Sequence, residues 1–367
     1  MADLSTLIRD LIADGSLDFV RTNPLAQFGP PNRPYLGATI LPERIVPNNE
    51  YREMGIQYRT VIANDGERYS PAQIKASGQI VGEFLVELGN SDLALEMTPA
   101  DYDALILYAQ SLGQQGFPAM SQAAQSILRL ADRAVAGLAM LTEKQRWQAI
   151  VGASVTREGD NGFAGTITYP NPAGHRAAAG GTWSSDSYDP YGDLVTMQEL
   201  FADKGYSVSR MITSTKVAGI LTRNAKMAAR FAPVRVLSGS DYFNTLTLAG
   251  VNAGLQANGL PAIEVNDALW RDQVTSGRML ADTVFVMVAQ TDDEAPEIAD
   301  GDDFMPDLGN TVGYTAIGRP SGQAASGRAL ELIAGEGKGA TIRAEAWQTS
   351  MPVITHPEGI AVVTGIS

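Results

Sequence analysis

Two stretches of this sequence combine residue types that could bind phosphate or a metal ion. The string Gly335-Glu336-Gly337-Lys338-Gly339 resembles a phosphate-binding loop, but such a loop needs Ser or Thr after the Lys and a different leading spacing. Residues 292–307 carry eight acids and no base, but they lack the spacing of a calcium-binding loop and its Glu at the twelfth position. A glycine-rich turn and a solvated acidic loop are therefore the better interpretations.

Nucleophilic and metal-dependent catalysis find little support in the sequence. The 367 residues include no Cys and only two His, and neither His175 nor His356 lies in an H-E-x-x-H pattern. No G-x-S-x-G string marks a nucleophilic Ser, although a Ser–His–Asp arrangement stays open because its members meet only in space. We therefore expect no catalytic residue, no cofactor and no metal site.

Composition limits the partners of the chain. Its net charge is −14, whereas proteins that grip phosphate backbones usually carry a basic patch, so we expect only non-specific contact with DNA. No apolar run reaches the roughly 18 residues of a membrane span, and the first 20 residues lack the pattern of a signal peptide. The sequence thus predicts a cytoplasmic protein that does not bind a membrane.

The first 47 residues have the composition of an extended arm. Apolar residues at 4, 7, 8, 11 and 12 have helical spacing, and residues 22–47 contain six Pro among further apolar residues. Pro favours extended chain, while a disordered linker would lack the apolar residues. We expect a segment that lies on its own domain or on a neighbour, with Leu7, Leu11 and Tyr35 as candidate contacts.

Residues 55–88 predict a long β-hairpin. Positions 56, 58, 60 and 62 alternate ahead of the turn Asn64-Asp65-Gly66, and a second extended run covers residues 79–88. The polar tip between them, residues 67–78, contains Lys75. Two strands without a third are poorly stable alone, so the hairpin should rest on another subunit or another domain.

Two helices are predicted next, over residues 98–111 and from about Pro118 to about Ile150. The longer helix shows helical spacing without a sustained leucine heptad, which favours packing on a sheet over a coiled coil. Its expected inner stripe consists of Ala124, Ile127, Leu128, Ala131, Ala134, Val135, Leu138 and Leu141.

The remaining residues predict a small α/β unit followed by returning strands. Strands are expected near 165–169, 207–212 and 283–288, with a helix that starts at Pro190 after an Asp189 cap and another over about 214–231. The second helix should turn Val217, Ile220, Leu221, Ala225 and Ala228 inward. Short runs at 341–346, 353–356 and 360–364 are expected to close a sheet.

The order of these elements resembles the Hong Kong 97-type capsid fold. Several strings also resemble the lambda-type major capsid protein E family: Gly180-Gly181-Thr182-Trp183, Tyr188-Asp189-Pro190, residues 207–214 and residues 350–366. The resemblance spans nearly the whole chain and implies an α+β architecture. It implies an N-terminal arm (1–47), an extended β-hairpin loop (48–95), a peripheral domain with a long spine helix (96–155), an α/β axial domain (156–308), and return strands of the peripheral domain (309–367).

This resemblance implies a major capsid protein that self-assembles, through pentamers and hexamers, into the icosahedral head shell around the double-stranded DNA of a tailed bacteriophage. The location would be the virion, after assembly in the host cytoplasm. A portal and a decoration protein are candidate partners. The arm-like pattern begins at residue 4, so a separate scaffold protein is expected. Lys75 is the only Lys in residues 48–95 and no Asn follows Asn310, so a Lys–Asn cross-link between subunits is not expected.

Charge points to one contact between subunits. Residues 205–240 contain six bases and no acid, in contrast to the acidic run 292–307. Arg223 and Arg230 are thus candidate partners of Asp300, Asp302 and Asp303 on a neighbour, and two separate solvated faces are the alternative. For the chain as a whole, the alternatives are an encapsulin-like compartment shell, a tail or adhesion protein, and a soluble enzyme.

Overall fold

The computed structural model describes residues 35–46, 50–58, 78–97, 100, 118–158, 164–231, 246–290, 312–323, 325–334 and 342–367. Its helices are α2 (Leu36–Ile40), α4 (Pro118–Gly152), α5 (Pro190–Ala202), α6 (Thr215–Arg223), α7 (Ala225–Phe231), α8 (Leu248–Ala257) and the 3-10 helix η3 (Pro357–Gly359). Its strands are β1 (Glu43–Ile45), β2 (Glu50–Tyr58), β3 (Gly78–Glu87), β4 (Gly89–Met97), β5 (Ser154–Glu158), β6 (Ala164–Thr168), β7 (Arg176–Ala178), β8 (Ser207–Thr213), β9 (Ile263–Val265), β10 (Leu269–Arg271), β11 (Ser276–Arg278), β12 (Phe285–Gln290), β13 (Gly313–Ile317), β14 (Arg328–Ala334), β15 (Ile342–Ile354) and β16 (Ile360–Thr364).

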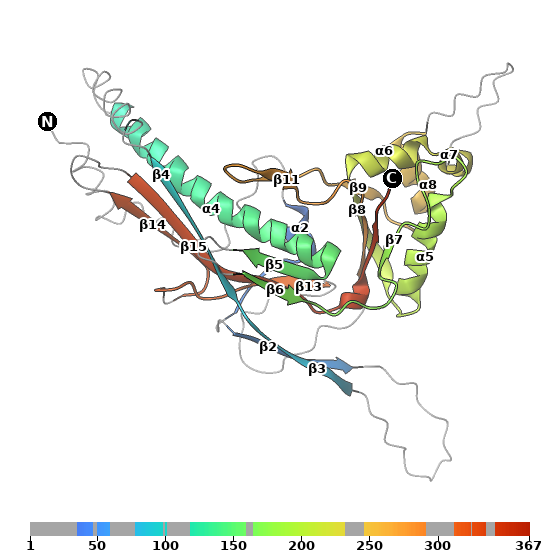
Figure 1. Ribbon diagram of the computed structural model, residues 1–367, viewed down its shortest axis with the longest axis horizontal. Coiled ribbons are helices and arrows are strands. Elements are labelled where there is room, and N and C mark those ends of the chain that lie inside the picture. Colours follow the sequence, from blue (N-terminus) through green and yellow to red (C-terminus); the bar gives the residue numbers. More distant parts are fainter. Residues whose placement is uncertain are drawn as a thin grey trace, which may run out of the picture.

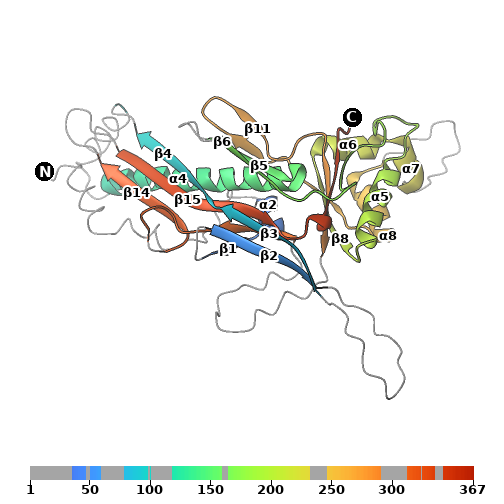
Figure 2. The same cartoon turned by 60° about the horizontal axis from the view of Figure 1, so that its bottom comes forward.

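The first sheet lies beneath the long helix α4 (Figure 1). Its order is β1-β13-β15-β14, with β4 antiparallel to the first part of β15. The inward face of β4 carries Leu93 and Leu95, which pack with Leu138 of α4 and with Ala344 of β15. Side chains alternate across a strand, so one face of this sheet packs against α4 (Figure 2). Where β13 pairs with β15, the opposite face carries a small core of its own, formed by Leu88, Tyr314, Ala316, Met351 and Val353.

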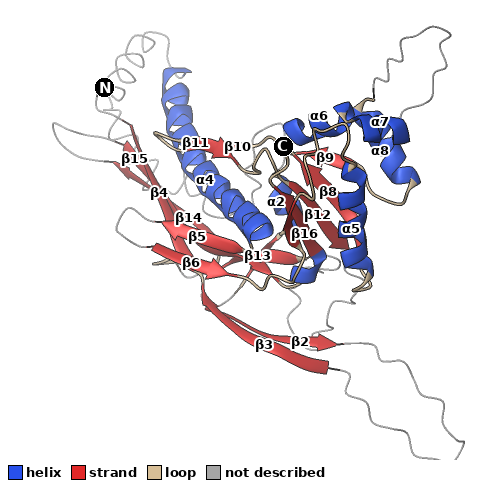
Figure 3. Cartoon of the chain, turned by 45° about the vertical axis from the view of Figure 1, so that its right-hand side comes forward, coloured by secondary structure: helices blue, strands red, loops and turns tan. Residues whose placement is uncertain are grey.

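The second sheet has the order β7-β16-β12-β8-β9 and is covered on both faces. Phe285 and Met287 of β12 pack into a core with helices α5 to α8. The intervening residue Val286 faces a second core that contains Trp147 and Ile150 from the end of α4. Helices α5 to α8 gather at this end of the molecule (Figure 3), so the end of α4 is the joint between the two sheets.

Three two-stranded hairpins complete the fold: β2–β3, β5–β6 and β10–β11. The predicted long hairpin is confirmed, since Glu50 to Tyr58 pair antiparallel with Glu87 to Gly78. Its first strand begins at Glu50, earlier than predicted, and the pair extends away from the two sheets (Figure 1). The predicted turn at 64–66 and Lys75 lie outside the described residues.

Several predicted elements are confirmed with small shifts of their bounds. Helix α4 runs from Pro118 to Gly152, and α5 begins at Pro190 with the Asp189 carboxylate accepting a hydrogen bond from the Tyr191 amide. Strands β6, β8, β12 and β16 occur where strands were expected. The short helix predicted over 98–111 lies outside the described residues apart from Ala100.

Other predictions were wrong. The helix expected over 214–231 is two helices, α6 and α7, because Asn224 has an extended ψ of 127° and caps α7 with its side chain. Ala225 is therefore exposed rather than inward. Leu141 is 36% exposed, since the buried side of α4 there is formed by polar residues that the hydropathy pattern excluded.

The C-terminal strands also differ from expectation. The two runs expected at 341–346 and 353–356 form one strand, β15, which passes through Pro352. Thr315 of β13 lies opposite Pro352, and its backbone amide donates to the Pro42 carbonyl rather than to β15. The backbone nitrogen of Pro352, which has no hydrogen to donate, therefore faces away from β13. Strand β16 joins the second sheet between β7 and β12, so the C-terminal residues are divided between the two sheets.

Candidate functional site

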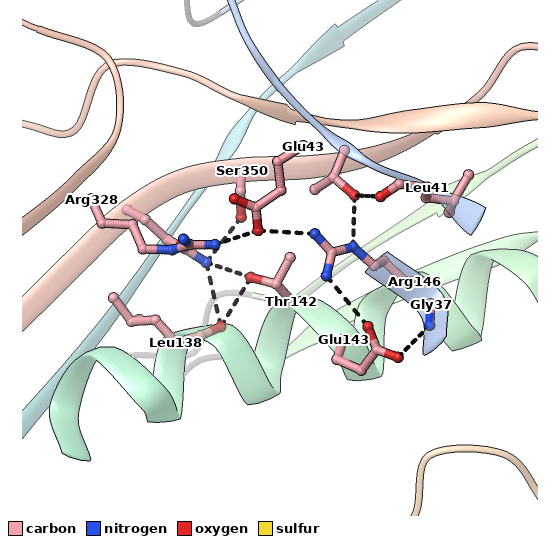
Figure 4. A network of polar contacts seen from close by, with 11 residues as sticks. Gly37, Leu41, Glu43, Leu138, Thr142, Glu143, Arg146, Arg328 and Ser350 are labelled. Carbon is pink, nitrogen blue, oxygen red and sulfur yellow. Dashed lines mark hydrogen bonds and ion pairs between the residues drawn. The ribbon is translucent and has the colours of Figure 1, made fainter. Parts of the chain in front are cut away.

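The segment that enters the described fold at residue 35 is anchored by a buried carboxylate of α4. The Gly37 amide and the Trp147 indole each donate to Oε1 of Glu143 over 2.7 Å. The Glu143 side chain is 1% exposed. A Cβ at position 37 would lie 2.6 Å from Oε1, so only Gly lets the backbone of α2 approach this carboxylate (Figure 4).

Two arginines continue this network towards the first sheet. Arg146, which is 2% exposed, contacts Glu143 at 3.3 Å and Glu43 at 3.0 Å. Its Nε donates to the Thr315 hydroxyl over 2.8 Å. Arg328 approaches the same Glu43 oxygen at 2.5 Å (Figure 4). Two carboxylates thus face two guanidinium groups, and strands β1, β13 and β14 are tied to α4 through them.

Glu43 accepts hydrogen bonds from both Arg146 and Arg328, and these two arginines determine the direction in which its pKa is shifted. Burial by itself would raise the pKa of Glu43, but Arg328 and Arg146 outweigh burial and hold it below its ordinary value. Buried ion pairs lose hydration on folding, and removing one partner leaves an uncompensated charge. We call the set Gly37, Glu43, Glu143, Arg146 and Arg328 the arm anchor, because its contacts hold Gly37 and Glu43, in the described part of the predicted arm, against α4 and β14.

Uncharged residues extend the arm anchor into β15. The Gln348 side chain accepts from Arg328 Nε at 2.8 Å and donates to the Thr142 hydroxyl at 2.6 Å and the Ser350 hydroxyl at 3.2 Å. Thr142 in turn donates to the Leu138 carbonyl, one turn earlier in α4. Every buried polar group named here therefore has a hydrogen-bond partner, as buried polar groups require.

The residues of the Gly180–Pro190 strings form a second polar cluster around Asp193. Its carboxylate accepts from the Trp183 indole at 2.7 Å and the Tyr188 hydroxyl at 2.6 Å. Partial burial and the hydrogen bond to Asp193 raise the pKa of Tyr188 to about 12. A Cβ on Gly180 would lie 2.4 Å from the Tyr188 hydroxyl oxygen. This part of the motif is thus explained by packing.

Asn224 joins this loop to the helices of the second sheet. Its side-chain amide donates to the carbonyls of Trp183, Ser185 and Tyr188 over 2.9 to 3.1 Å. Its side-chain oxygen accepts from the amides of Lys226 and Met227. One residue therefore ends α6, starts α7 and holds the loop.

The predicted contact residues fall into three groups. Leu7, Leu11, Lys75, Asp300, Asp302 and Asp303 lie outside the described residues. Tyr35 is half-buried against its own chain, and burial and nearby Glu143 raise its pKa. Arg230 contacts Asp189 at 2.7 Å and the Tyr191 ring, while Arg223 is exposed on α6. The predicted charge pairs therefore remain a prediction, because their acidic members lie outside the described residues.

The sequence interpretation missed the arm anchor. A usable signal was present, because Thr142, Arg146 and Ala149 continue the helical spacing of Leu138. Polar residues at stripe positions of a helix indicate a buried network when a complementary charge lies elsewhere in the chain. Which of the 27 bases and 41 acids of the chain are those partners is not evident from spacing alone.

Of the residues that could have suggested catalysis, His175 is described, and its contacts are those of a packed core residue. His175 is 3% exposed, with Nδ1 3.1 Å from the Ile360 carbonyl and its ring edge-on to Phe201. The string 335–339 and the run 292–307 lie outside the described residues. Among the described residues, no group of three or more His, Cys, Asp or Glu could hold a metal ion. No helix among them is long and apolar enough to cross a membrane.

The sequence matches the family described as phage major capsid protein E over residues 92–311. No curated protein matches it. A crystal structure described as a prophage capsid protein from E. coli CFT073 superposes with a TM-score of 0.57 at 14% identity, covering 100% of both chains. A phage-related protein from Bordetella bronchiseptica RB50 gives a TM-score of 0.48 at 14% identity, covering 90% of this chain and 91% of that one. The holo-SrpI encapsulin complex of Synechococcus elongatus PCC 7942 gives a TM-score of 0.43 at 10% identity, covering 97% of this chain and 95% of that one.

Proposed function

Because this chain belongs to the phage major capsid protein E family, we propose that it assembles through pentamers and hexamers into the icosahedral head shell of a tailed phage. The family match covers residues 92–311, which include α4 and most of the second sheet. It favours a capsid shell over an encapsulin-like compartment, a tail or adhesion protein, and an enzyme. The role proposed is structural, with no catalytic step.

The proposal rests on one structural observation in particular. The β2–β3 hairpin is a two-stranded sheet that extends away from the rest of the chain (Figure 1), and such a pair is marginally stable in water without further packing. Neighbouring copies of the chain would supply that packing. The arm anchor supports the same role for the N-terminal segment, since it holds residues 35–46 in a fixed direction. Leu7, Leu11, Tyr35 and Lys75 remain predicted contacts on those neighbours.

We propose domain bounds that follow the sheets. The arm covers residues 1–47 and the extended loop 48–95. The peripheral domain comprises 96–155 and 309–359, and the axial domain comprises 156–308 and 360–367. Placing the last residues in the axial domain is supported by β16, which pairs with β7 and β12. Scaffold, portal and decoration proteins, non-specific contact with packaged DNA, and assembly in the host cytoplasm remain predictions.

Light scattering and electron microscopy of the purified full-length chain at rising concentration test the proposal. Capsomers or closed shells are expected, either from the chain alone or after co-expression with the scaffold protein of the same phage. A chain that stays monomeric at high concentration in both settings would contradict the capsid function.

A further inference from the structure

The charged residues of helices α6, α7 and α8, at one end of the second sheet, are all basic, although the acids Asp189 and Asp267 on neighbouring loops contact Arg230 and Thr215. Helices α6 and α7, residues 215–231, contain four bases and no acid, and α8 contains no charged residue. This is unusual in a chain with a net charge of −14. Figure 1 shows these helices together at one end of the molecule. A local surface of one sign favours a partner of the other sign.

Not every base in this region is free to bind a partner. Arg210 of β8 makes a two-pronged contact with Glu264 at 2.7 and 2.8 Å, and Arg230 pairs with Asp189. Lys216 and Lys226 are exposed and have no ion pair among the described residues. Arg223 is exposed and donates Nε to the Gly219 carbonyl of its own helix. We call Lys216, Arg223 and Lys226 the basic strip.

The same chain contains a segment of opposite charge, the acidic run 292–307 with its eight acids. It follows β12, whose last residue, Gln290, pairs with Ser207 at the start of β8. Helix α6 begins only after β8 ends at Thr213. Seven strand residues at about 3.3 Å each separate these points by about 20 Å. Gln290, the last described residue before the acidic run, therefore lies at the end of β8 opposite to the start of α6.

We propose that the basic strip of one subunit binds the acidic run of a neighbouring copy. The inference rests on the proposed capsid function and specifies one contact between its subunits. Each copy would then present a strip to one neighbour and a run to the other, which is the head-to-tail arrangement that closes a ring. Single exposed pairs are weak and screened by salt, but several acids facing three bases, repeated at each interface, add together.

A charge swap tests the pairing in trans. One variant reverses the charge of the strip (Lys216→Glu, Arg223→Glu, Lys226→Glu). The other changes the net charge of the run from −8 to +4 by six substitutions (Asp292→Lys, Asp293→Lys, Glu294→Lys, Asp300→Lys, Asp302→Lys, Asp303→Lys). A control reverses three exposed bases elsewhere, Arg129→Glu and Arg133→Glu on α4 and Arg271→Glu on β10. It has the same net charge as the strip variant. The readout is the fraction assembled, by sedimentation, against NaCl concentration.

Each variant alone should assemble about tenfold less than wild type at low salt, because like charges then meet at every interface. An equal mixture of the two should recover hexamers to within about twofold of wild type, since copies that alternate around a ring of six restore opposite charges at every contact. A ring of five cannot alternate and keeps at least one contact between like charges, so pentamers should recover less. The control should assemble as wild type does.

Three results would overturn the pairing. If the strip and run variants assemble to the same extent as the control, the strip does not bind the run. If the mixture assembles no better than either variant alone, any contact between strip and run forms within one chain. A strip variant that assembles normally but loses bound nucleic acid would assign the strip to DNA. Failure of wild type and control to assemble would instead count against the capsid function.

Discussion

The backbone amide of Gly37 donates to Oε1 of Glu143 over 2.7 Å and thereby joins residues 106 positions apart in the chain. A Cβ at position 37 would lie 2.6 Å from that oxygen, so Gly37→Ala should displace α2 from α4. We expect a loss of about 1–3 kcal/mol in the free energy of unfolding, as overpacked sites show. Urea unfolding of the unassembled chain measures it. Gly192→Ala is the matched control because no atom lies within 4 Å of its added Cβ, and an equal midpoint for both variants would contradict the anchor.

Removing Arg146 should cost more than removing the whole ion pair. Arg146→Met leaves Glu143, which is 1% exposed, without its cationic partner, and a broken buried pair typically costs about 3–5 kcal/mol. Adding Glu143→Gln to Arg146→Met should restore part of that loss. The measurement is a double-mutant cycle by urea unfolding. Additive effects of the two substitutions would show that their interaction does not contribute.

The arm anchor should make the fold sensitive to acid. The pKa of Glu43 in the fold lies below the ordinary 4.5 because Arg328 and Arg146 outweigh the effect of burial. A carboxyl group with a lowered folded pKa stabilises the fold above its unfolded pKa, and this stability is lost as the pH falls through the folded pKa. Glu43→Gln should therefore lower stability at pH 7 and flatten the decline below about pH 4.5. Urea midpoints between neutral and acidic pH test this, with exposed Asp92→Asn of β4 as control. If the urea midpoint of the Glu43 variant falls with decreasing pH as steeply as that of the wild type, Glu43 does not have a lowered pKa in the fold.

Asn224→Ala should destabilise the second sheet and its helices. It removes hydrogen bonds to the carbonyls of Trp183, Ser185 and Tyr188 and the cap of α7. A lost cap together with unpaired buried acceptors costs about 2–4 kcal/mol. Asn258→Ala is the control, because its side chain makes one exposed bond, to the Gly254 carbonyl. Thermal unfolding should separate the two variants clearly, and similar melting temperatures would show that Asn224 is not a structural hub.

Two neighbouring leucines of α4 give opposite expectations. Leu138 is 1% exposed and Leu141 is 36% exposed. Leu138→Asp puts a charge without a partner into the layer between α4 and the first sheet, at a cost of several kcal/mol, so insoluble or unassembled protein is expected. Leu141→Asp should remain soluble and assemble. Expression yield and electron micrographs of both variants decide this, and a shell-forming Leu138 variant would mean that the buried face of α4 is misplaced.

Local patterns predicted the long elements of this fold well. The apolar spacing that includes Leu138 predicted α4, and the Asp189-Pro190 pair predicted the start of α5, because both signals act within one or two turns of chain. The break at Asn224 was missed because its acceptors, the carbonyls of Trp183, Ser185 and Tyr188, lie 36 to 41 positions away. Pairing over such separations cannot be seen in a window of helical length.

The candidate site shows the same limit more strongly. Glu143 and Arg146 are ordinary helix residues by sequence, and only the arrival of Gly37, Glu43 and Arg328 from three other segments makes them a buried network. The family strings around Trp183 were recognisable as a pattern, but their packing around Asp193 was not evident from the pattern. Spacing predicts where an element lies, whereas the partners of its polar residues depend on the tertiary fold.

Strand β16 lies second in the five-strand order of the second sheet, between β7 and β12. Its neighbours come from distant parts of the chain, since Val362 pairs with Arg176 of β7 and with Val286 of β12. A truncation before Ile360 would separate β7 from β12 and would remove Ala361 and Val363 from the core beneath α5 to α8. Because such contacts join residues far apart in sequence, the second sheet should close late in folding, after residues 360–364 have been synthesised.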